Sequence, residues 1–342
     1  MGNIDIKEEV YKCSRCGLCG SVCPVFLTLK NEIYLPRGRF NILNRHFQSS
    51  IPLSKKFIRD LDICLNCGEC TKFCPSSIDS VKIFTQLKNE YKTDIIPFSL
   101  KYKLILLLHS IKKLFIKNSL YKVNTARIKT YTVSKQADIV YFQGCFNRYI
   151  NPSDKNAALN LLNMHGYNIL KVINSCCGLP YLSEGSLDKF KKNIERIKKS
   201  VPDNAQYIVC SCSSCFKTLS EAFKDSSIKL ITIDKLIPYD DTLGNFLYHK
   251  PYAHSEYKGN IPLLNKKGSC SMMENYFMLK HPDLAEQLFE TVFYSKDDVK
   301  DNDIVTSCAL DKWGLIEGFK KKGINAGVYS IAEYIYKTRI KH

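Results

Sequence analysis

Sixteen cysteines, many of them gathered in tight runs, constrain this chain of 342 residues more than any other feature. The pattern C-x2-C-x2-C-x3-C-P occurs twice near the N-terminus, at Cys13, Cys16, Cys19, Cys23 and Pro24, and again at Cys64, Cys67, Cys70, Cys74 and Pro75. Such short gaps suit metal ligands, whereas a secreted protein spreads its thiols through a disulfide framework. The runs therefore predict metal sites in a protein of a reducing compartment.

The two runs predict a pair of 4Fe-4S clusters with crossed ligand sets. Three closely spaced thiolates wrap one cluster, while the more distant fourth thiolate reaches the other cluster. We expect one cluster on Cys13, Cys16, Cys19 and Cys74, and the other on Cys64, Cys67, Cys70 and Cys23. Gly17 and Gly68 permit tight turns inside the two loops. Two structural zinc sites are the alternative, although zinc usually takes two separated C-x2-C pairs.

The length of the chain allows two or three compact units, each with its own core. Residues 1–95 contain both runs, and helical spacing over 35–47, 51–61 and 79–91 indicates that the runs connect helices. Residues 96–135 form a basic, apolar stretch without cysteine. We expect a helical dicluster ferredoxin unit followed by a helical linker.

The remainder indicates an α/β unit. Short β-branched or aromatic runs at 138–142, 169–173 and 207–210 alternate with helical stretches at 154–165 and 187–199. This alternation predicts a parallel sheet with crossover helices. The fold class expected for the whole chain is therefore α+β multidomain.

A weaker repeat divides the α/β region into halves at 136–240 and 241–342. The segment 208–212 (IVCSC) is similar to 304–308 (IVTSC). The segment 231–237 likewise corresponds to 328–335. Two related α/β halves are therefore expected, of which the second is altered.

A second cysteine constellation lies in the first half, with the spacing C-x30-C-C-G-x33-C-x2-C. Its members are Cys145, Cys176, Cys177, Gly178, Cys212 and Cys215. Each part follows a predicted strand, and α/β proteins build their sites in the crevice at those strand ends. The five thiols can therefore converge. Cys210 lies outside the pattern and is expected to face the core.

The second half departs from this pattern. Tyr252 stands where the first cysteine belongs, Ser269-Cys270-Ser271 replaces the paired thiols, and Asp311 follows Cys308 in place of a final cysteine. We expect no cluster there and interpret this half as a structural partner that closes over the first. His249 and His254 are expected to be ordinary loop residues.

The formal net charge of +17 does not by itself indicate a nucleic-acid partner. Lysine outnumbers arginine by 41 to 9, and arginine is the residue favoured for phosphate recognition. In the linker, the apolar positions Leu104, Leu107, Leu108, Ile111, Leu114 and Phe115 predict an amphipathic helix too short to span a bilayer. We favour its packing on the protein's own domains over contact with an anionic membrane surface and a quinone.

The arrangement of these motifs resembles the iron-sulfur subunit family of glycolate oxidase and its lactate-dehydrogenase relatives. The resemblance rests on residues 36–39 (PRGR), 64–70 (CLNCGEC), Gly144-Cys145 and 176–178 (CCG). It implies an alpha-helical ferredoxin module of the kind found in respiratory dehydrogenases, followed by cysteine-rich CCG domains like those of heterodisulfide reductase. It also implies a noncubane 4Fe-4S cluster, as a third cofactor, on Cys145, Cys176, Cys177, Cys212 and Cys215.

The resemblance further implies an electron-transfer subunit that receives electrons from an FAD-binding dehydrogenase acting on glycolate, lactate or a similar acid. The chain has no G-x-G-x-x-G dinucleotide loop, so no catalytic residue is assigned to it. Alternatives are a heterodisulfide-reductase-like thiol/disulfide subunit and an iron-sulfur subunit of the anaerobic glycerol-3-phosphate dehydrogenase type. Residues 1–11 carry no export signal, so a cytoplasmic protein is expected, with peripheral contact to the inner face of the membrane as an option.

Overall fold

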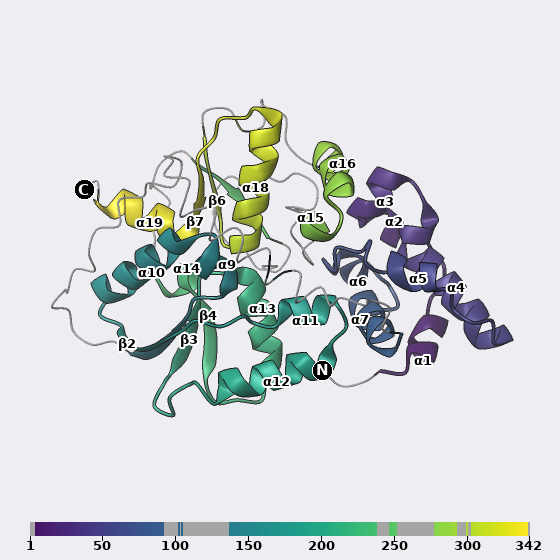
Figure 1. Ribbon diagram of the computed structural model, residues 1–342, viewed down its shortest axis with the longest axis horizontal. Helices are drawn as coiled ribbons and strands as arrows, with labels where there is room; N and C mark the ends of the chain where they lie inside the picture. Colours follow the sequence, from purple (N-terminus) through teal and green to yellow (C-terminus); the bar gives the residue numbers. More distant parts are fainter. Residues whose placement is uncertain are drawn as a thin grey trace.

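The computed structural model describes residues 4–91, 137–237, 246–251, 277–292 and 302–340, together with Tyr102, Leu104 and Val299. A helical unit lies at one end of the molecule and two α/β halves lie at the other (Figure 1). The expected α+β multidomain class is confirmed.

Short helices build the N-terminal unit: α1 (Ile6–Tyr11), α2 (Cys19–Val22), α3 (Pro24–Leu29), α4 (Pro36–Ser49), α5 (Lys55–Asp60), α6 (Glu69–Lys72) and α7 (Ser80–Glu90). Its core is formed by side chains such as Phe40, Leu43 and Phe84. The helix expected over 51–61 begins only at Lys55, because the Ser54 hydroxyl accepts a hydrogen bond of 3.1 Å from the Phe57 N–H and so caps the first turn.

The first α/β half is a parallel sheet in the order β2-β1-β3-β4. Its strands are β1 (Asp138–Phe142), β2 (Asn168–Ile173), β3 (Tyr207–Cys210) and β4 (Lys229–Thr232). Its helices are α9 (Cys145–Tyr149), α10 (Pro152–Met164), α11 (Leu179–Ser183), α12 (Leu187–Lys198), α13 (Ser213–Ala222) and α14 (Ile233–Leu236). The central strands are fully buried, as expected for a parallel sheet with helices on both faces.

The second half repeats part of this plan with β5 (Phe246–His249), β6 (Asp303–Thr306) and β7 (Val328–Ser330), paired in parallel in the order β5-β6-β7. Its helices are α15 (Phe277–Lys280), α16 (Pro282–Val292), α18 (Ala309–Lys322) and α19 (Ile331–Ile340). Cys212 caps α13 and Cys308 caps α18, and both have the same extended backbone conformation. The correspondence of 208–212 with 304–308 is therefore structural.

The second half contacts both of the other units. With the first half it shares a core in which Tyr248 and Ile335 pack with Tyr141 and Leu161. With the helical unit it shares another core, in which Leu288 and Phe319 of α16 and α18 pack with side chains such as Val25 and Leu65. The second half therefore bridges the helical unit and the first half.

Among the described residues no helix is both long and apolar enough to span a membrane. The linker helix predicted between 103 and 117 lies outside the described residues, apart from Leu104, whose exposure is 56%. One linker residue, Tyr102, is 2% exposed and joins the core of the first half.

Candidate iron-sulfur sites

Four thiols line one cavity in the helical unit: Cys23, Cys64, Cys67 and Cys70. The first of them comes from the first run and the other three from the second. Burial raises the pKa of Cys23 to about 11 and that of Cys70 to about 12. Such buried thiols ionise when a metal neutralises them, which suits an iron-sulfur cluster. The grouping is the crossed set expected from the spacing, and its role as a ligand set stays a prediction.

The other set is more open. Cys13 and Cys74 both pack against the core of the helical unit, although they belong to different runs. Cys16 is exposed, and a hydrogen bond from the Leu18 backbone lowers the pKa of its thiol. Burial raises the pKa of Cys19 instead. This half of the ferredoxin unit is therefore closer to solvent than the cavity lined by Cys23.

The two cysteine loops share a backbone conformation. Gly17 and Gly68 have φ values of +85° and +81°, and Arg15 and Asn66 also lie in the left-handed region. The predicted turns at both glycines are therefore present. In the second loop the Asn66 N–H donates to the Cys64 sulfur at 3.4 Å, a contact that would orient a ligating thiolate.

The five thiols of the CCG pattern converge at the carboxyl ends of the strands of the first half. The Cys145 and Cys176 sulfurs lie 3.6 Å apart. The Cys177 thiol is in hydrogen-bonding contact with Cys176 and Cys215, and Cys215 is in turn in contact with Cys212. The spacing alone predicts this convergence, and the fold brings the five side chains together.

Mutual hydrogen bonds make these thiols unequal. The bond from Cys176, followed by that from Cys215, lowers the pKa of Cys177. Bonds from Cys215 and Cys308 likewise lower the pKa of Cys212. Thiolates are the species that ligate metals, so the site favours ionisation at these two sulfurs even though it is buried.

Local backbone features position the thiols. Gly144 has a φ of +71°, and a Cβ atom at this position would lie 3.0 Å from the Cys215 sulfur. A side chain at 144 would therefore crowd the site. Gly178 has a φ of +97° and makes the turn expected after Cys177. Cys210, by contrast, is a fully buried residue of β3 and packs in the core, as expected.

The sequence analysis did not identify two residues that lie next to the CCG thiols. The Tyr102 hydroxyl lies 3.1 Å from the Cys145 sulfur, and its ring stacks on Phe146 at 6.0 Å between centroids. Cys308 of the second half lies 3.2 Å from the Ser214 hydroxyl and contacts Cys212. Neither contact has a local signal in the sequence, because both join distant segments.

In the second half the residue at the position of Cys215 is Asp311, which contacts a buried histidine. His249 Nε2 lies 3.3 Å from Asp311 Oδ2, and the two side chains are 0% and 1% exposed. His249 is thus the buried last residue of β5, and the expectation that it is an ordinary loop residue is wrong. The other substituted positions, Tyr252, His254 and 269–271, lie outside the described residues.

A largely buried polar cluster, here called the Asp62 hub, joins the units next to the cysteine sites. Its members are Asp62, Lys88, Lys280 and Ser183. The Asp62 carboxylate pairs with Lys88 Nζ at 3.0 Å and with Lys280 Nζ at 3.2 Å. Burial alone would raise the pKa of Asp62, but the two ammonium groups lower it to about 2. Lys88 donates to the Ser183 carbonyl at 3.1 Å, and Lys280 donates to the Ser183 hydroxyl at 2.5 Å.

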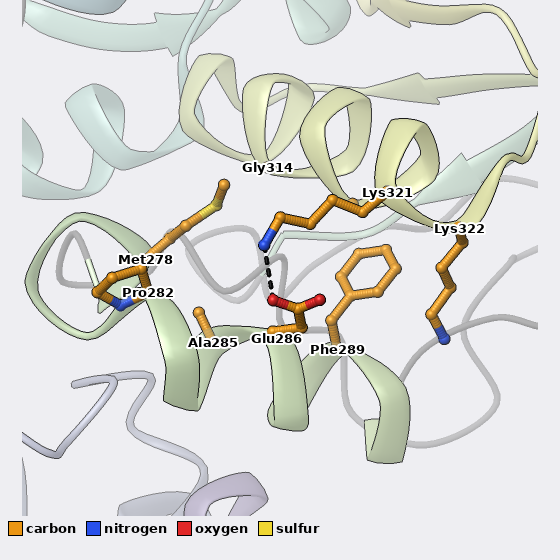
Figure 2. Close-up of a pocket in the computed structure, with 9 residues that line it drawn as sticks. Met278, Pro282, Ala285, Glu286, Phe289, Gly314, Lys321 and Lys322 are labelled. Carbon is orange, nitrogen blue, oxygen red and sulfur yellow. Dashed lines mark hydrogen bonds and ion pairs between the residues drawn. The ribbon is translucent and has the colours of Figure 1, made fainter.

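Within the described part of the chain, no three Cys, His, Asp or Glu side chains are grouped so as to hold a single metal ion. A hollow of about 70 Å³ lies between α16 and α18 (Figure 2). Lys321 of α18 and Glu286 of α16 form an ion pair of 2.7 Å across it, and Phe289 lies beside this pair. This hollow is too small for an organic ligand.

Family models match the ferredoxin thiols and the CCG thiols separately. Residues 9–78 match a 4Fe-4S dicluster domain, and 56–113 match a second model with the same description. Residues 139–220 match a cysteine-rich domain of the CCG type. The matched ranges contain all thirteen cysteines of the predicted sites.

The relatives come from more than one kind of oxidoreductase. The chain is 25% identical over 234 residues to a subunit of the dihydromethanophenazine:CoB–CoM heterodisulfide reductase of Methanosarcina mazei, a match that covers 61% of this chain and 56% of that protein. It is 21% identical over 233 residues to the glycolate oxidase iron-sulfur subunit of Escherichia coli, covering 59% and 56%. It is 24% identical over 249 residues to a subunit of the fumarate reductase (CoM/CoB) of Methanothermobacter marburgensis, covering 67% and 48%.

The chain spans about half the length of the curated relatives it matches. The dicluster match precedes the CCG match along the chain, and each match contains one of the two groups of thiols. The chain therefore contains a 4Fe-4S dicluster domain followed by a cysteine-rich CCG domain, and it is similar to glycolate oxidase iron-sulfur subunits and to heterodisulfide reductase subunits.

Proposed function

We propose that this protein is the iron-sulfur electron-transfer subunit of a flavin-dependent 2-hydroxy acid dehydrogenase complex. Electrons would enter from an FAD-bearing partner at the CCG site and leave through the ferredoxin unit toward a quinone or another carrier. The relative named glycolate oxidase iron-sulfur subunit, which this chain matches over 59% of its length, supports this class of complex.

The thiol sets support the cofactors of this proposal. Cys13, Cys16, Cys19 and Cys74 would hold one 4Fe-4S cluster, and Cys23, Cys64, Cys67 and Cys70 a second. The five CCG thiols would hold a third cluster, of the noncubane type. Each cluster would supply one-electron transfer, and the chain's own residues tune it through burial and hydrogen bonds to sulfur.

The observation that carries the proposal is the Asp62 hub, because it fixes the two sites relative to each other. Asp62 lies two residues before Cys64, and Ser183 lies on α11, which begins directly after the CCG turn at Gly178. Hydrogen bonds through the buried Lys88 and Lys280 side chains connect them. Electron transfer within one chain requires cofactor sites that lie near each other, and this contact between the two thiol-bearing segments supports it.

A thiol/disulfide redox subunit of the heterodisulfide-reductase type is the second candidate. Cys308 favours it, since this thiol of the second half contacts Cys212 at the CCG site. The relative from the heterodisulfide reductase of Methanosarcina mazei covers a similar share of the chain. Turnover of a disulfide by the purified protein with a low-potential reductant would favour this candidate over electron transfer.

Anaerobic purification with metal analysis tests the cofactor content. We expect about twelve irons per chain, about four for each of three clusters, and a brown sample with electron paramagnetic resonance signals after reduction. A colourless sample with near-stoichiometric zinc would contradict the proposal.

Affinity purification of the tagged chain from its own cells tests the partner. We expect a flavoprotein to co-purify, visible by its bound-flavin absorbance, and the iron-sulfur signals to appear when a 2-hydroxy acid is added. If dithionite produces the signals but none of the 2-hydroxy acids tested does, the clusters are present and the proposal of a 2-hydroxy acid dehydrogenase complex is wrong.

A further inference from the structure

A cavity of about 540 Å³ lies between the helical unit and the first α/β half. Its lining comes mainly from α7, α11, α12 and α13, whose positions can be followed in Figure 1, and from the loop residue Asn66. The volume falls within the range of small-molecule sites in proteins. Unlike the hollow of Figure 2, this cavity can therefore accommodate an organic molecule.

The cavity reaches toward both kinds of thiol site. Asn66 lies between Cys64 and Cys67 in the second ferredoxin loop. On the opposite wall, Leu179 follows the CCG sequence directly and Ser214 precedes Cys215. An occupant would therefore lie between the ferredoxin site and the CCG site.

Among the described residues that line the cavity there is no cysteine. An occupant would therefore be separated from the thiol sites by side chains such as Leu179 and Ser214. A disulfide or thiol substrate needs to reach a sulfur or a metal to react, whereas electrons cross a few ångströms of protein without a bond. The lining therefore favours a redox-active ring over a molecule that bonds to the site.

The walls have the chemistry of a ring-binding site. Leu179, Leu182, Phe190 and Phe216 provide apolar and aromatic surface. Asn66 contributes a carboxamide whose Oδ1 atom has no hydrogen-bond partner among the described residues, and the lining also includes the charged residues Asp79, Lys82, Lys217 and Glu221. A carboxamide can donate to a carbonyl oxygen or accept from a hydroxyl, so it can bind the oxidised and reduced forms of the same ring.

We propose that this cavity binds a quinone between the ferredoxin and CCG sites, with one ring oxygen on the Asn66 side chain. The inference rests on the proposed electron-transfer function and specifies its acceptor. On reduction, the quinone would take two electrons, one after the other, from the ferredoxin site next to Asn66 and two protons from solvent, and would leave as the quinol. Both carbon–oxygen double bonds become hydroxyl groups, and each transfer oxidises the ferredoxin site by one electron, which the CCG site replaces.

Binding of duroquinone to the anaerobically purified full-length protein tests the proposal. All ring carbons of this quinone are substituted, so the protein's thiols cannot add to it. We expect saturable binding by equilibrium dialysis, and Ser220→Trp, which fills the cavity from α13, should raise the Kd by at least about tenfold. Asn66→Asp, which removes the amide donor, should raise the Kd for the quinone by about tenfold.

The exposed Ser49→Trp on α4 is the matched control, because it adds the same ring outside the cavity and should leave the Kd unchanged. Absence of saturable binding, or an equal Kd for Ser220→Trp and wild type, would overturn the inference. Saturable binding of cystamine that Ser220→Trp abolishes, without duroquinone binding, would overturn it in favour of a disulfide. Iron content and electron paramagnetic resonance signals are measured on the same samples. A sample that contains clusters but binds no quinone contradicts only this inference, whereas a sample without clusters contradicts the proposed electron-transfer function itself.

Discussion

The two α/β halves place the same scaffold around different chemistry. In the first half the Tyr141 hydroxyl lies 2.8 Å from the Ser211 hydroxyl, and in the second half the Tyr248 hydroxyl lies 2.8 Å from that of Ser307. Each pair joins the first strand of its half to the residue before the helix-capping cysteine. The scaffold is therefore conserved within the molecule down to individual hydrogen bonds.

The difference begins one helical turn later. Cys215 lies three residues after the capping Cys212, and Asp311 lies three residues after Cys308. Asp311 pairs with His249, whose counterpart in the strand register is Phe142. The comparison teaches that the same scaffold holds a thiol at the position of Cys215 in one half and a buried carboxylate paired with a histidine in the other.

The largest expected effect concerns iron. Cys177→Ser removes a central thiol of the CCG site and should lower the iron content by about four per chain, because a cluster that loses a ligand is not retained. Cys308→Ser removes the thiol of the other half that corresponds to Cys212 and that is assigned to no cluster, so it should leave the iron content unchanged. Iron and sulfide analysis of the two variants compares the halves, and equal losses would show that Cys308 is also a ligand.

The next effect concerns stability. Asp311→Ala removes the carboxylate that pairs with the buried His249. We expect it to lower the free energy of unfolding by about 3–5 kcal/mol, because the histidine then stays buried without the partner that compensates for its loss of hydration. The double variant His249→Phe, Asp311→Cys recreates the first half's residues and should recover much of this loss. Urea unfolding measures both. A double variant that is less stable than Asp311→Ala would contradict the structural correspondence between the two halves.

A pH effect is expected where the halves meet. Burial, followed by repulsion from Glu333, raises the pKa of Asp154 from 3.8 to about 7. The folded state thus holds a proton that the unfolded state has lost between these pH values, so this group's contribution to stability falls as the pH rises from about 4 to about 7 and is constant above. Asp154→Asn should flatten that part of the urea-midpoint profile, while an unchanged slope would exclude Asp154 as its source.

The smallest effect is expected at the surface of the second half. The Lys321–Glu286 pair of Figure 2 is 53% and 52% exposed, so solvent and salt weaken it. Lys321→Ala should lower the free energy of unfolding by less than about 1 kcal/mol. Urea unfolding of this variant beside Asp311→Ala compares an exposed pair with a buried one in the same half, and a loss as large as that of Asp311→Ala would contradict their ranking by burial.

The sequence predicted those features that depend on local spacing. The two ferredoxin loops, the CCG thiols and most helices and strands follow from short-range patterns, because turn glycines, caps and β-branched runs act within a few residues. The contact of Tyr102 with Cys145 could not be predicted, since 43 residues separate them. The His249–Asp311 pair likewise exists only because the parallel strands bring β5 beside β6. Pairing across a sheet is set by the whole fold rather than by either segment.

The Asp62 hub also has a consequence for the order of synthesis. Lys280 follows Asp62 by 218 residues. The helical unit therefore leaves the ribosome long before the lysine that pairs with Asp62. N-terminal units of a growing chain fold first. The helical unit can therefore fold before Lys280 has been made, and its contact with Asp62 forms only after most of the second half has been synthesised.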